Sequence, residues 1–317
     1  MKVFVGKLFI LMGVFLRSDV VIANLIKNIR PVDYGAFVES RIQYLKSEKN
    51  YDLIMIGDSH LADAIDTRIL EEKCQISAYN LAIYHATPFD NYFFLKKVLD
   101  SGKKPKYLVL GTNPEMFYKK AMPSKYLYSI VDDRCLNIEM NMRGQGNFDA
   151  YALMKSGNEK YLVPTLFKKI SGETYKPTRK VKAVYNGFLE FTNQTENLDW
   201  DHFSVKGKKL QSEQIRYFCK LIELAVNNNM QVVIANPPIW KNKSNAFENT
   251  TYFLAFKRTL ELVSEKYKLP IYNQSNREMD PVLVKKDFLN LDHLNYSGAQ
   301  KTTSNFAQWY NNNRKLN

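Results

Sequence analysis

The stretch Tyr51 to Ala64, YDLIMIGDSHLADA, contains the point at which a buried strand is expected to give way to a helix. Its apolar run LIMI stops at Gly57, and Asp58 and Ser59 follow before a helical pattern begins. A small hydroxyl residue at such a helix entrance suits a nucleophile, because glycine lets the backbone turn sharply and the first helical N–H groups face whatever binds. The alternative is that Asp58 or Ser59 simply caps the helix.

On both sides of this stretch, strand patterns alternate with helical patterns. Strands are predicted at residues 53–56, 76–82, 107–110, 231–235 and 269–272, and helices at residues 38–47, 61–72, 89–100, 215–228, 251–266 and 297–310. This spacing is typical of βαβ units and predicts an α/β fold with a parallel sheet. Residues 118–210 break the alternation and are too many for a plain loop, so we expect them to form an insertion or cap over the sheet.

Polar residues follow three successive strands, and the carboxyl ends of parallel strands open on one crevice. Ser59 follows the first strand, residues 83–87 follow the second, and Asn113 follows the third. His293 stands just before the last predicted helix and is the expected base, because a serine needs a nearby base to attack at neutral pH. Backbone N–H groups and the Asn113 amide would then face the oxyanion of an acyl-transfer reaction.

These motifs resemble those of the SGNH/GDSL hydrolase superfamily, in particular its bacterial envelope-associated members. Residues 57–60 (GDSH) look like its first block, residues 111–113 (GTN) like its third, and residues 290–295 (NLDHLN) like its last. The resemblance implies a three-layer α/β/α, flavodoxin-like fold and hydrolysis or transfer of small acyl groups. It also implies Ser59 as nucleophile, His293 as base and Asn113 as oxyanion donor, together with the N–H of Ser59 itself.

The chain departs from the superfamily pattern at two positions. Counting from Asn80, the residue expected to offer a second oxyanion N–H is His85 instead of the usual glycine. Any residue except proline has this N–H, so the donor survives if the backbone permits.

The second departure is Asn290, which stands where the superfamily carries an acid three residues before its histidine. Asparagine can accept from the His293 Nδ1–H but cannot stabilise an imidazolium by charge. Asp292 and Asp287 are the candidates to supply that charge, although the side chain of Asp292 is expected to diverge from its neighbour His293. The sequence thus predicts either a weakened triad or a Ser–His dyad.

The amino-acid composition indicates which classes of partner and cofactor are to be expected. The net charge of +13 indicates an anionic partner such as a membrane surface or an acidic polymer, with solvated lysines as the alternative. No zinc-knuckle spacing, aromatic RNA-binding signature or basic recognition helix is found, so no nucleic acid partner is expected. The three cysteines, Cys74, Cys135 and Cys219, have no metal-ligand spacing, and neither a disulfide framework, a metal nor another cofactor is expected.

The N-terminus has the order of an export signal: Lys2 and Lys7, the apolar run from Leu8 to Leu16, and then a polar segment. We therefore expect residues 1–30 to be a signal or membrane-anchor segment, residues 31–317 to be the α/β domain, and the protein to face the periplasm or the cell surface. The predicted function is a serine esterase or O-acyltransferase acting on acyl esters, acetyl above all, of an envelope or extracellular polysaccharide. The alternative is a weakly active or inactive protein of the same fold that binds an anionic glycan or polymer.

Overall fold

A computed structural model describes residues 32–124, 127, 130, 131, 181–191, 207–239, 250–273, 283–290 and 292–314. The chain divides into two compact units, and almost all of these residues belong to the one formed by Phe37–Ile130 and Arg179–Asn317. The expected leader at residues 1–30 and most of the expected insertion lie outside the described residues.

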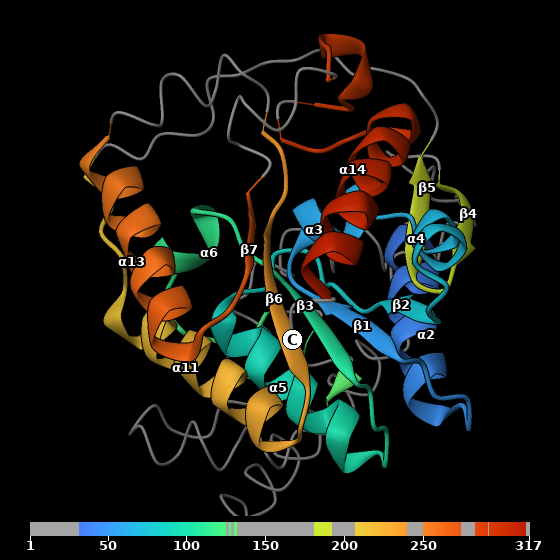
Figure 1. Cartoon of the computed structure of the whole chain (residues 1–317), viewed down its shortest axis with the longest axis horizontal. Helices are drawn as coiled ribbons and strands as arrows, with labels where there is room; N and C mark the ends of the chain where they lie inside the picture. The colour runs from blue at the N-terminus through green and yellow to red at the C-terminus, as the bar shows by residue number, and fades with distance from the viewer. Residues whose placement is uncertain are drawn as a thin grey trace, which may run out of the picture. The chain divides into compact units, whose positions relative to one another are not determined.

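Five parallel strands form the central sheet, in the order β2-β1-β3-β6-β7 (Figure 1). Their bounds are β1 Leu53–Ile56, β2 Ala78–Asn80, β3 Tyr107–Gly111, β6 Gln231–Asn236 and β7 Ile271–Asn273. This is the flavodoxin-like order, in which the chain winds outward in both directions from β1. The gap between the carboxyl ends of β1 and β3 is therefore the topological switch point of the sheet.

Helices cover both faces of the sheet, as the predicted fold class requires. They are α2 Val32–Lys46, α3 Ser59–Ala64, α4 Thr67–Cys74, α5 Pro88–Asp100, α6 Glu115–Tyr118, α11 Ser212–Asn227, α13 Thr251–Tyr267, the 3₁₀ turn η2 Lys285–Asp287 and α14 Tyr296–Arg314. Right-handed crossovers place the helices that follow β1 on one face and those that follow β2, β3 and β6 on the other. Accordingly α14 packs on α3 and α4, and α11 packs on α5 (Figure 1). The three-layer α/β/α fold is confirmed.

Two glycines set how closely the ends of β1 and β3 approach each other. A Cβ atom on Gly111 would lie 2.7 Å from the side chain of Leu61, and one on Gly57 would lie 3.0 Å from the Cα of Gly111. Because neither glycine has a side chain, the first turn of α3 packs directly against the end of β3. This close packing positions the residues at the start of α3.

The predicted helix at residues 61–72 is wrong in one respect, because it is two helices. Asp66 caps α4 by accepting from the N–H of Arg68, and its buried carboxylate pairs with the Arg68 guanidinium at 2.8 Å. A side chain that caps a new N-terminus ends the helix before it. The strand predicted at residues 76–82 is also shorter, since only Ala78–Asn80 pair with β1.

A β-hairpin is the main described part of residues 118–210. Its strands are β4 Val181–Tyr185 and β5 Phe188–Phe191, joined by Asn186 and Gly187, both with positive φ. The hairpin lies at the β2 edge of the sheet, where the Asn80 N–H donates to the Asn186 carbonyl at 2.8 Å. The buried Arg41 of α2 ties this edge together by donating to the carbonyls of Ala82 and Gly187. The expected cap over the sheet stays a prediction.

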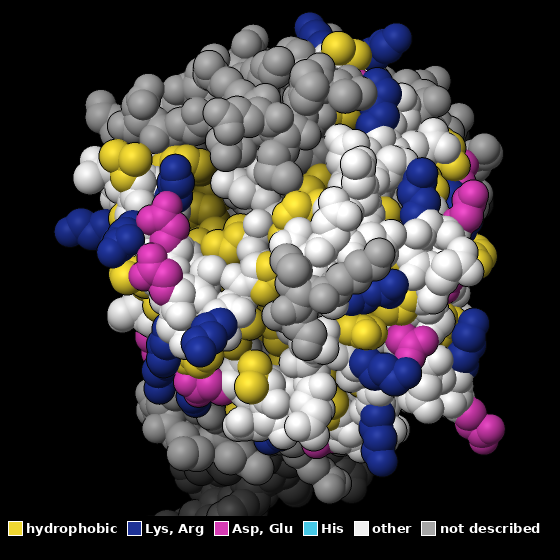
Figure 2. All heavy atoms as spheres, viewed as in Figure 1, with side chains coloured by type: hydrophobic (Ala, Val, Ile, Leu, Met, Phe, Trp, Pro, Cys, Tyr) yellow, Lys and Arg dark blue, Asp and Glu magenta, His cyan; other side chains and the backbone are white. Residues whose placement is uncertain are grey.

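On one face of the molecule the positive charge is dispersed. On the face drawn in Figure 2, Lys and Arg side chains lie over several elements with Asp and Glu side chains among them. Cys74 and Cys219 are free thiols, and Cys135 lies outside the described residues. Among the described helices, none combines the length and the apolar character that crossing a bilayer requires.

Candidate active site

The switch point of the sheet brings together the motifs that the sequence singled out. Asp58 caps α3 by accepting from the His60 N–H, and Ser59 is the first residue of this helix. Asn113 follows β3, and His293 belongs to the loop that precedes α14. Asp58 thus caps the helix, as the alternative interpretation of this motif expected of Asp58 or Ser59, and the Ser59 side chain lies at the helix entrance.

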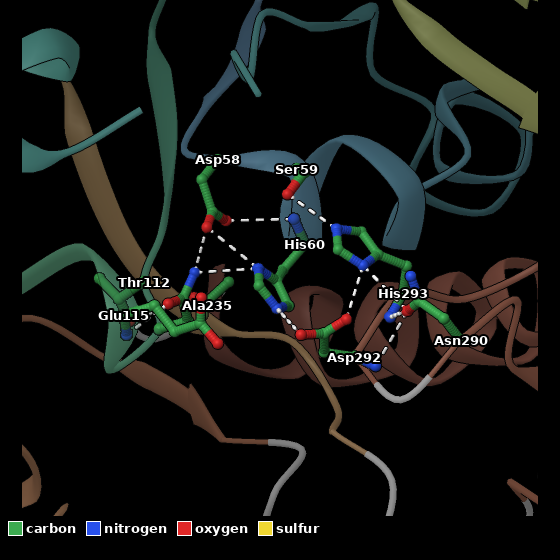
Figure 3. A network of polar contacts seen from close by, with 10 residues as sticks. Asp58, Ser59, His60, Thr112, Glu115, Ala235, Asn290, Asp292 and His293 are labelled. Atoms are coloured by element: carbon green, nitrogen blue, oxygen red, sulfur yellow. Dashed lines mark hydrogen bonds and ion pairs between the residues drawn. The ribbon is translucent and has the colours of Figure 1, made fainter. Parts of the chain in front are cut away.

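The hydroxyl of Ser59 lies 2.8 Å from Nε2 of His293, although the two residues are 234 positions apart in the sequence (Figure 3). The Ser59 residue is 8% exposed and the His293 side chain 14% exposed. A hydroxyl at this distance from a ring nitrogen can pass its proton to the imidazole, which is the geometry of an activated nucleophile. The structure therefore places the predicted nucleophile and base in direct contact.

Two side chains lie against Nδ1, the other ring nitrogen of His293. Asp292 Oδ1 is 2.7 Å away and Asn290 Oδ1 is 3.0 Å away. The Asn290 oxygen also accepts from the backbone N–H groups of Asp292 and His293, at 3.2 and 2.9 Å. Because a carbonyl oxygen has two lone pairs, these backbone bonds leave Asn290 a weak partner for the ring. The nearer carboxylate is the stronger acceptor.

The expectation that Asp292 diverges from its neighbour His293 is wrong, and the turn explains why. Asn290 accepts from the backbone N–H groups of Asp292 and His293, which draws these residues into a turn, and Phe288 pairs with Leu294 across the loop. This fold turns both side chains toward the same space. Asp287 was the other candidate to supply negative charge to His293. Its carboxylate instead accepts from Lys301 at 2.8 Å and from Ser297 at 2.9 Å.

A second histidine, His60, belongs to the same network and was not identified from the sequence. Its Nδ1 lies 3.0 Å from Asp58 Oδ2, and its Nε2 lies 3.8 Å from Asp292 Oδ2. The rings of His60 and His293 stack, with 4.8 Å between their centroids and 21° between their planes. Asp292 therefore lies between two imidazoles, with one carboxylate oxygen toward each (Figure 3). The only sequence signal was the short spacing of Asp58 and His60 in the GDSH motif.

Charges in this network stabilise one another. Burial opposes ionisation of Asp58 and Asp292, but the positive charge and hydrogen bonds of the neighbouring histidines outweigh it and lower the pKa of both carboxyl groups. Burial also disfavours a positive charge on His60 and by itself would lower the pKa of the ring. The charges and hydrogen bonds of Asp58 and Asp292 outweigh this effect and raise the pKa well above its usual value. The two carboxylates beside His60 therefore favour its protonated form.

Of the three predicted oxyanion donors, Ser59 is described above, and the other two, Asn113 and His85, lie in different surroundings. Asn113 is buried, its Oδ1 accepts from the Glu115 N–H at 2.7 Å, and its Nδ2 donates to Asp58 Oδ2 and lies 3.0 Å from His60 Nδ1. The side chain of His85 is exposed, and its backbone has a φ of 60°. This left-handed conformation is one that glycine adopts easily, which explains the glycine usual at this position. The loop of His85 does lie beside the first motif, since Ile83 donates to the Gly57 carbonyl.

His60, Asp292 and His293 bring possible metal-ligand atoms within 4.8 Å of one another. These atoms already face one another or Ser59 at hydrogen-bond and ion-pair distances. We therefore interpret the cluster as a proton-transfer network.

Neither a family profile nor a curated protein matches the chain. Solved structures do, among them a protein of the G-D-S-L family from Desulfitobacterium hafniense (10% identity, 81% of this chain and 97% of that chain, TM-score 0.41). A second is the esterase EstA from Pseudoalteromonas sp. (11% identity, 84% of this chain and 98% of that chain, TM-score 0.41). A third is the acetyl xylan esterase AlAXEase (10% identity, 81% of this chain and 98% of that chain, TM-score 0.40).

Proposed function

We propose that the protein is a serine esterase or O-acyltransferase in which Ser59, His293 and Asp292 form the catalytic triad. The Ser59 oxygen attacks the acyl carbon while its proton passes to His293 Nε2. The same proton then goes to the departing alcohol, which leaves an acyl group on Ser59. Water or the hydroxyl of an acceptor attacks this acyl-enzyme and passes its proton to His293. As the bond between the acyl carbon and the Ser59 oxygen breaks, His293 gives that proton to the oxygen, which restores the Ser59 hydroxyl.

The contact between the Ser59 hydroxyl and the His293 ring, backed by the carboxylate of Asp292, supports this proposal above all. An imidazole fixed at Nδ1 presents an unprotonated Nε2 to the serine, and a carboxylate there stabilises the imidazolium that forms. Asp292 thus supplies the charge that Asn290 lacks, and the triad is complete despite the departure from the superfamily pattern.

Oxyanion stabilisation is assigned to Asn113 and to the backbone N–H groups of Ser59 and His85. An amide nitrogen has two hydrogens, so Asn113 can donate one to Asp58 and offer the other to the developing oxyanion. Donors held in place before the reaction need no reorganisation as the charge develops. The bond to Asp58 would hold the amide in this way.

The substrate we propose is an acyl ester, acetyl above all, of a cell-envelope or extracellular polysaccharide. Two features of the sequence support it: the net charge of +13, which suits an anionic polymer or membrane surface, and the export-like N-terminus. The protein would then act at the periplasmic or cell-surface side, either exported or anchored through residues 1–30.

Labelling with a fluorophosphonate probe tests the catalytic serine directly. The wild-type protein should form a covalent adduct on Ser59, whereas Ser59→Ala should form none and Ser101→Ala, at an exposed helix end, should label as the wild type does. Absence of an adduct on folded wild-type protein would refute the proposal and favour the glycan-binding alternative. Incubation with an acetyl donor and a polysaccharide acceptor then separates the two reactions: transfer faster than hydrolysis identifies a transferase.

A further inference from the structure

The triad gives no role to His60, although its side chain is less exposed than that of His293, the other histidine at the site. Its side chain is 5% exposed, against 14% for His293. Its ring stacks on that of His293, with 4.8 Å between the ring centroids. A buried histidine usually serves packing, so its contacts must decide whether it does more.

We propose that His60 is a positioning residue for the Ser59–His293 pair, which acts by holding the carboxylate of Asp292 against Nδ1 of His293. This inference rests on the proposed function and adds to the triad a fourth member that does not touch the substrate. The active unit then runs from Asp58 through His60, Asp292 and His293 to Ser59.

The geometry shows why Asp292 needs such a partner. It belongs to a loop, its side chain is 18% exposed, and it precedes the histidine that it must support. Oδ1 lies 2.7 Å from His293 and Oδ2 lies 3.8 Å from His60 Nε2, so both carboxylate oxygens face imidazoles. A carboxylate attracted from both sides loses the rotation that would turn it toward solvent.

His60 can hold Asp292 because it is itself fixed. Its Nδ1 faces Asp58 Oδ2 at 3.0 Å, its backbone N–H donates to Asp58 Oδ1 at 3.1 Å, and the side chain of Asn113 lies against the same edge of the ring. Asp58 is in turn the cap of the helix that carries Ser59. The nucleophile and the support of its base are therefore anchored at a single helix turn.

Charge favours the same arrangement. The groups that face His60 are Asp58, Asp292 and the ring of His293, and Lys119, which follows α6, acts on Asp58. The two carboxylates raise the pKa of His60, and an imidazolium there keeps Asp292 ionised in a site that is mostly shielded from water. An ionised Asp292 is the form that stabilises charge on His293 during the reaction.

A double-mutant cycle tests the proposal with His60→Gln, Asp292→Asn and the double variant. Loss of one charge-assisted contact predicts a roughly 10- to 100-fold lower kcat for His60→Gln with little change in KM. In the Asp292→Asn background the same substitution should cost almost nothing further, because the carboxylate through which His60 acts is gone. Equal losses in both backgrounds would overturn the proposal.

A matched control separates positioning from folding. Thr303→Val removes a buried hydroxyl of α14 that accepts from the Asp66 N–H at 2.8 Å and donates to the Ala299 carbonyl at 2.7 Å, and none of these residues belongs to the triad. It should lower the unfolding midpoint and leave kcat unchanged. If His60→Gln changes only the midpoint, as this control does, then His60 is a packing residue and the proposal fails.

Nuclear magnetic resonance of ¹⁵N-histidine protein gives a readout that does not depend on turnover, and the chain has only four histidines. The Nδ1–H of His293 should be strongly deshielded in the wild type, and His60→Gln should shift it toward the position found in Asp292→Asn. An unchanged resonance would overturn the positioning role. A wild-type protein that shows this coupling but neither labels nor hydrolyses esters would refute the proposed function alone.

Discussion

The two imidazoles of the site share one carboxylate and differ in what their outer nitrogens face. Nε2 of His293 faces the hydroxyl of Ser59 at 2.8 Å, whereas Nδ1 of His60 faces the carboxylate of Asp58 at 3.0 Å. A neutral donor leaves an imidazole free to accept a proton, while a second carboxylate keeps it charged. The group that faces the ring nitrogen turned away from Asp292 therefore decides which histidine is a base and which is a fixed cation.

Removing the base should have the largest effect. His293→Gln keeps a polar side chain but cannot take the Ser59 proton, so kcat for ester hydrolysis should fall by about 10⁴-fold or more, as in other triads. Steady-state kinetics with a chromogenic acetate ester measure this loss. The far smaller loss expected for His60→Gln is the internal reference: comparable losses for the two variants would mean that the histidines have been assigned the wrong roles.

Asp292→Asn comes next, because it removes the carboxylate that the two rings share. Asn290 still lies 3.0 Å from His293 Nδ1 and can help to keep the ring in the right tautomer. The loss in kcat should therefore be smaller than the roughly 10⁴-fold found where no second acceptor exists, and about 10²- to 10³-fold is expected. Rate measurement on protein with an unchanged circular dichroism spectrum checks it. Activity equal to the wild type would assign the orienting role to Asn290.

The fixed cation should also be visible in the pH dependence of stability. Burial opposes the charge on His60, but Asp58 and Asp292 outweigh it and raise its pKa in the folded state. The folded protein then binds this proton more tightly than the unfolded chain, whose histidine titrates near pH 6.5. The contribution of protonated His60 to the free energy of unfolding is therefore complete below about pH 6.5. It is lost as the pH rises through the folded-state pKa of His60.

Urea unfolding between pH 6 and 8 measures this contribution. The unfolding free energy of the wild type should include a decrease of up to about 1.4 kcal/mol per pH unit from this one proton, and His60→Gln should lack it. The carboxylates do not interfere, since their pKa values are lowered and their effect is lost only in acid. Identical slopes for the two proteins would show that His60 is not charged in the folded state.

The sequence predicted the sheet and the distant histidine, and the reasons are physical. Strands β1, β3 and β6 are covered on both faces, so they appear as continuous apolar runs that end at glycine or asparagine. Parallel strands also bring their carboxyl ends together, which is why Ser59 and Asn113 could be expected at one crevice. These features follow from local pattern and topology alone.

Other features depended on signals that went unused. The hairpin β4–β5 is joined by Asn186-Gly187, the pair most typical of a tight hairpin turn, between two runs of strand character. The break between α3 and α4 is marked by Asp66, a common cap residue. Both signals were local, and weighing turn and cap residues against the surrounding irregular pattern would have found them.

The sharing of Asp292 could not be predicted from the sequence. It depends on the turn that Asn290 stabilises, on the stacking of two rings 233 residues apart, and on the close packing that Gly111 permits under α3. Each of these is a tertiary contact between groups whose sequence neighbours give no sign of it. By position alone, Asn290 seemed the natural partner of His293 and Asp292 did not.

Substitutions of Asn290 should change kcat least, and they test directly whether Asp292 or Asn290 supports His293. Asn290→Ala removes the acceptor of two backbone N–H groups, so it should lower the unfolding free energy by about 1 kcal/mol and reduce kcat less than Asp292→Asn does. Asn290→Asp restores the acid at the position where the superfamily has it, yet kcat should not exceed that of the wild type. A carboxylate already lies 2.7 Å from His293, and a second one beside it would be repelled by the first. Chemical unfolding and ester kinetics of both variants measure these effects, and a gain in rate for Asn290→Asp would mean that Asp292 does not fill the place of the missing acid.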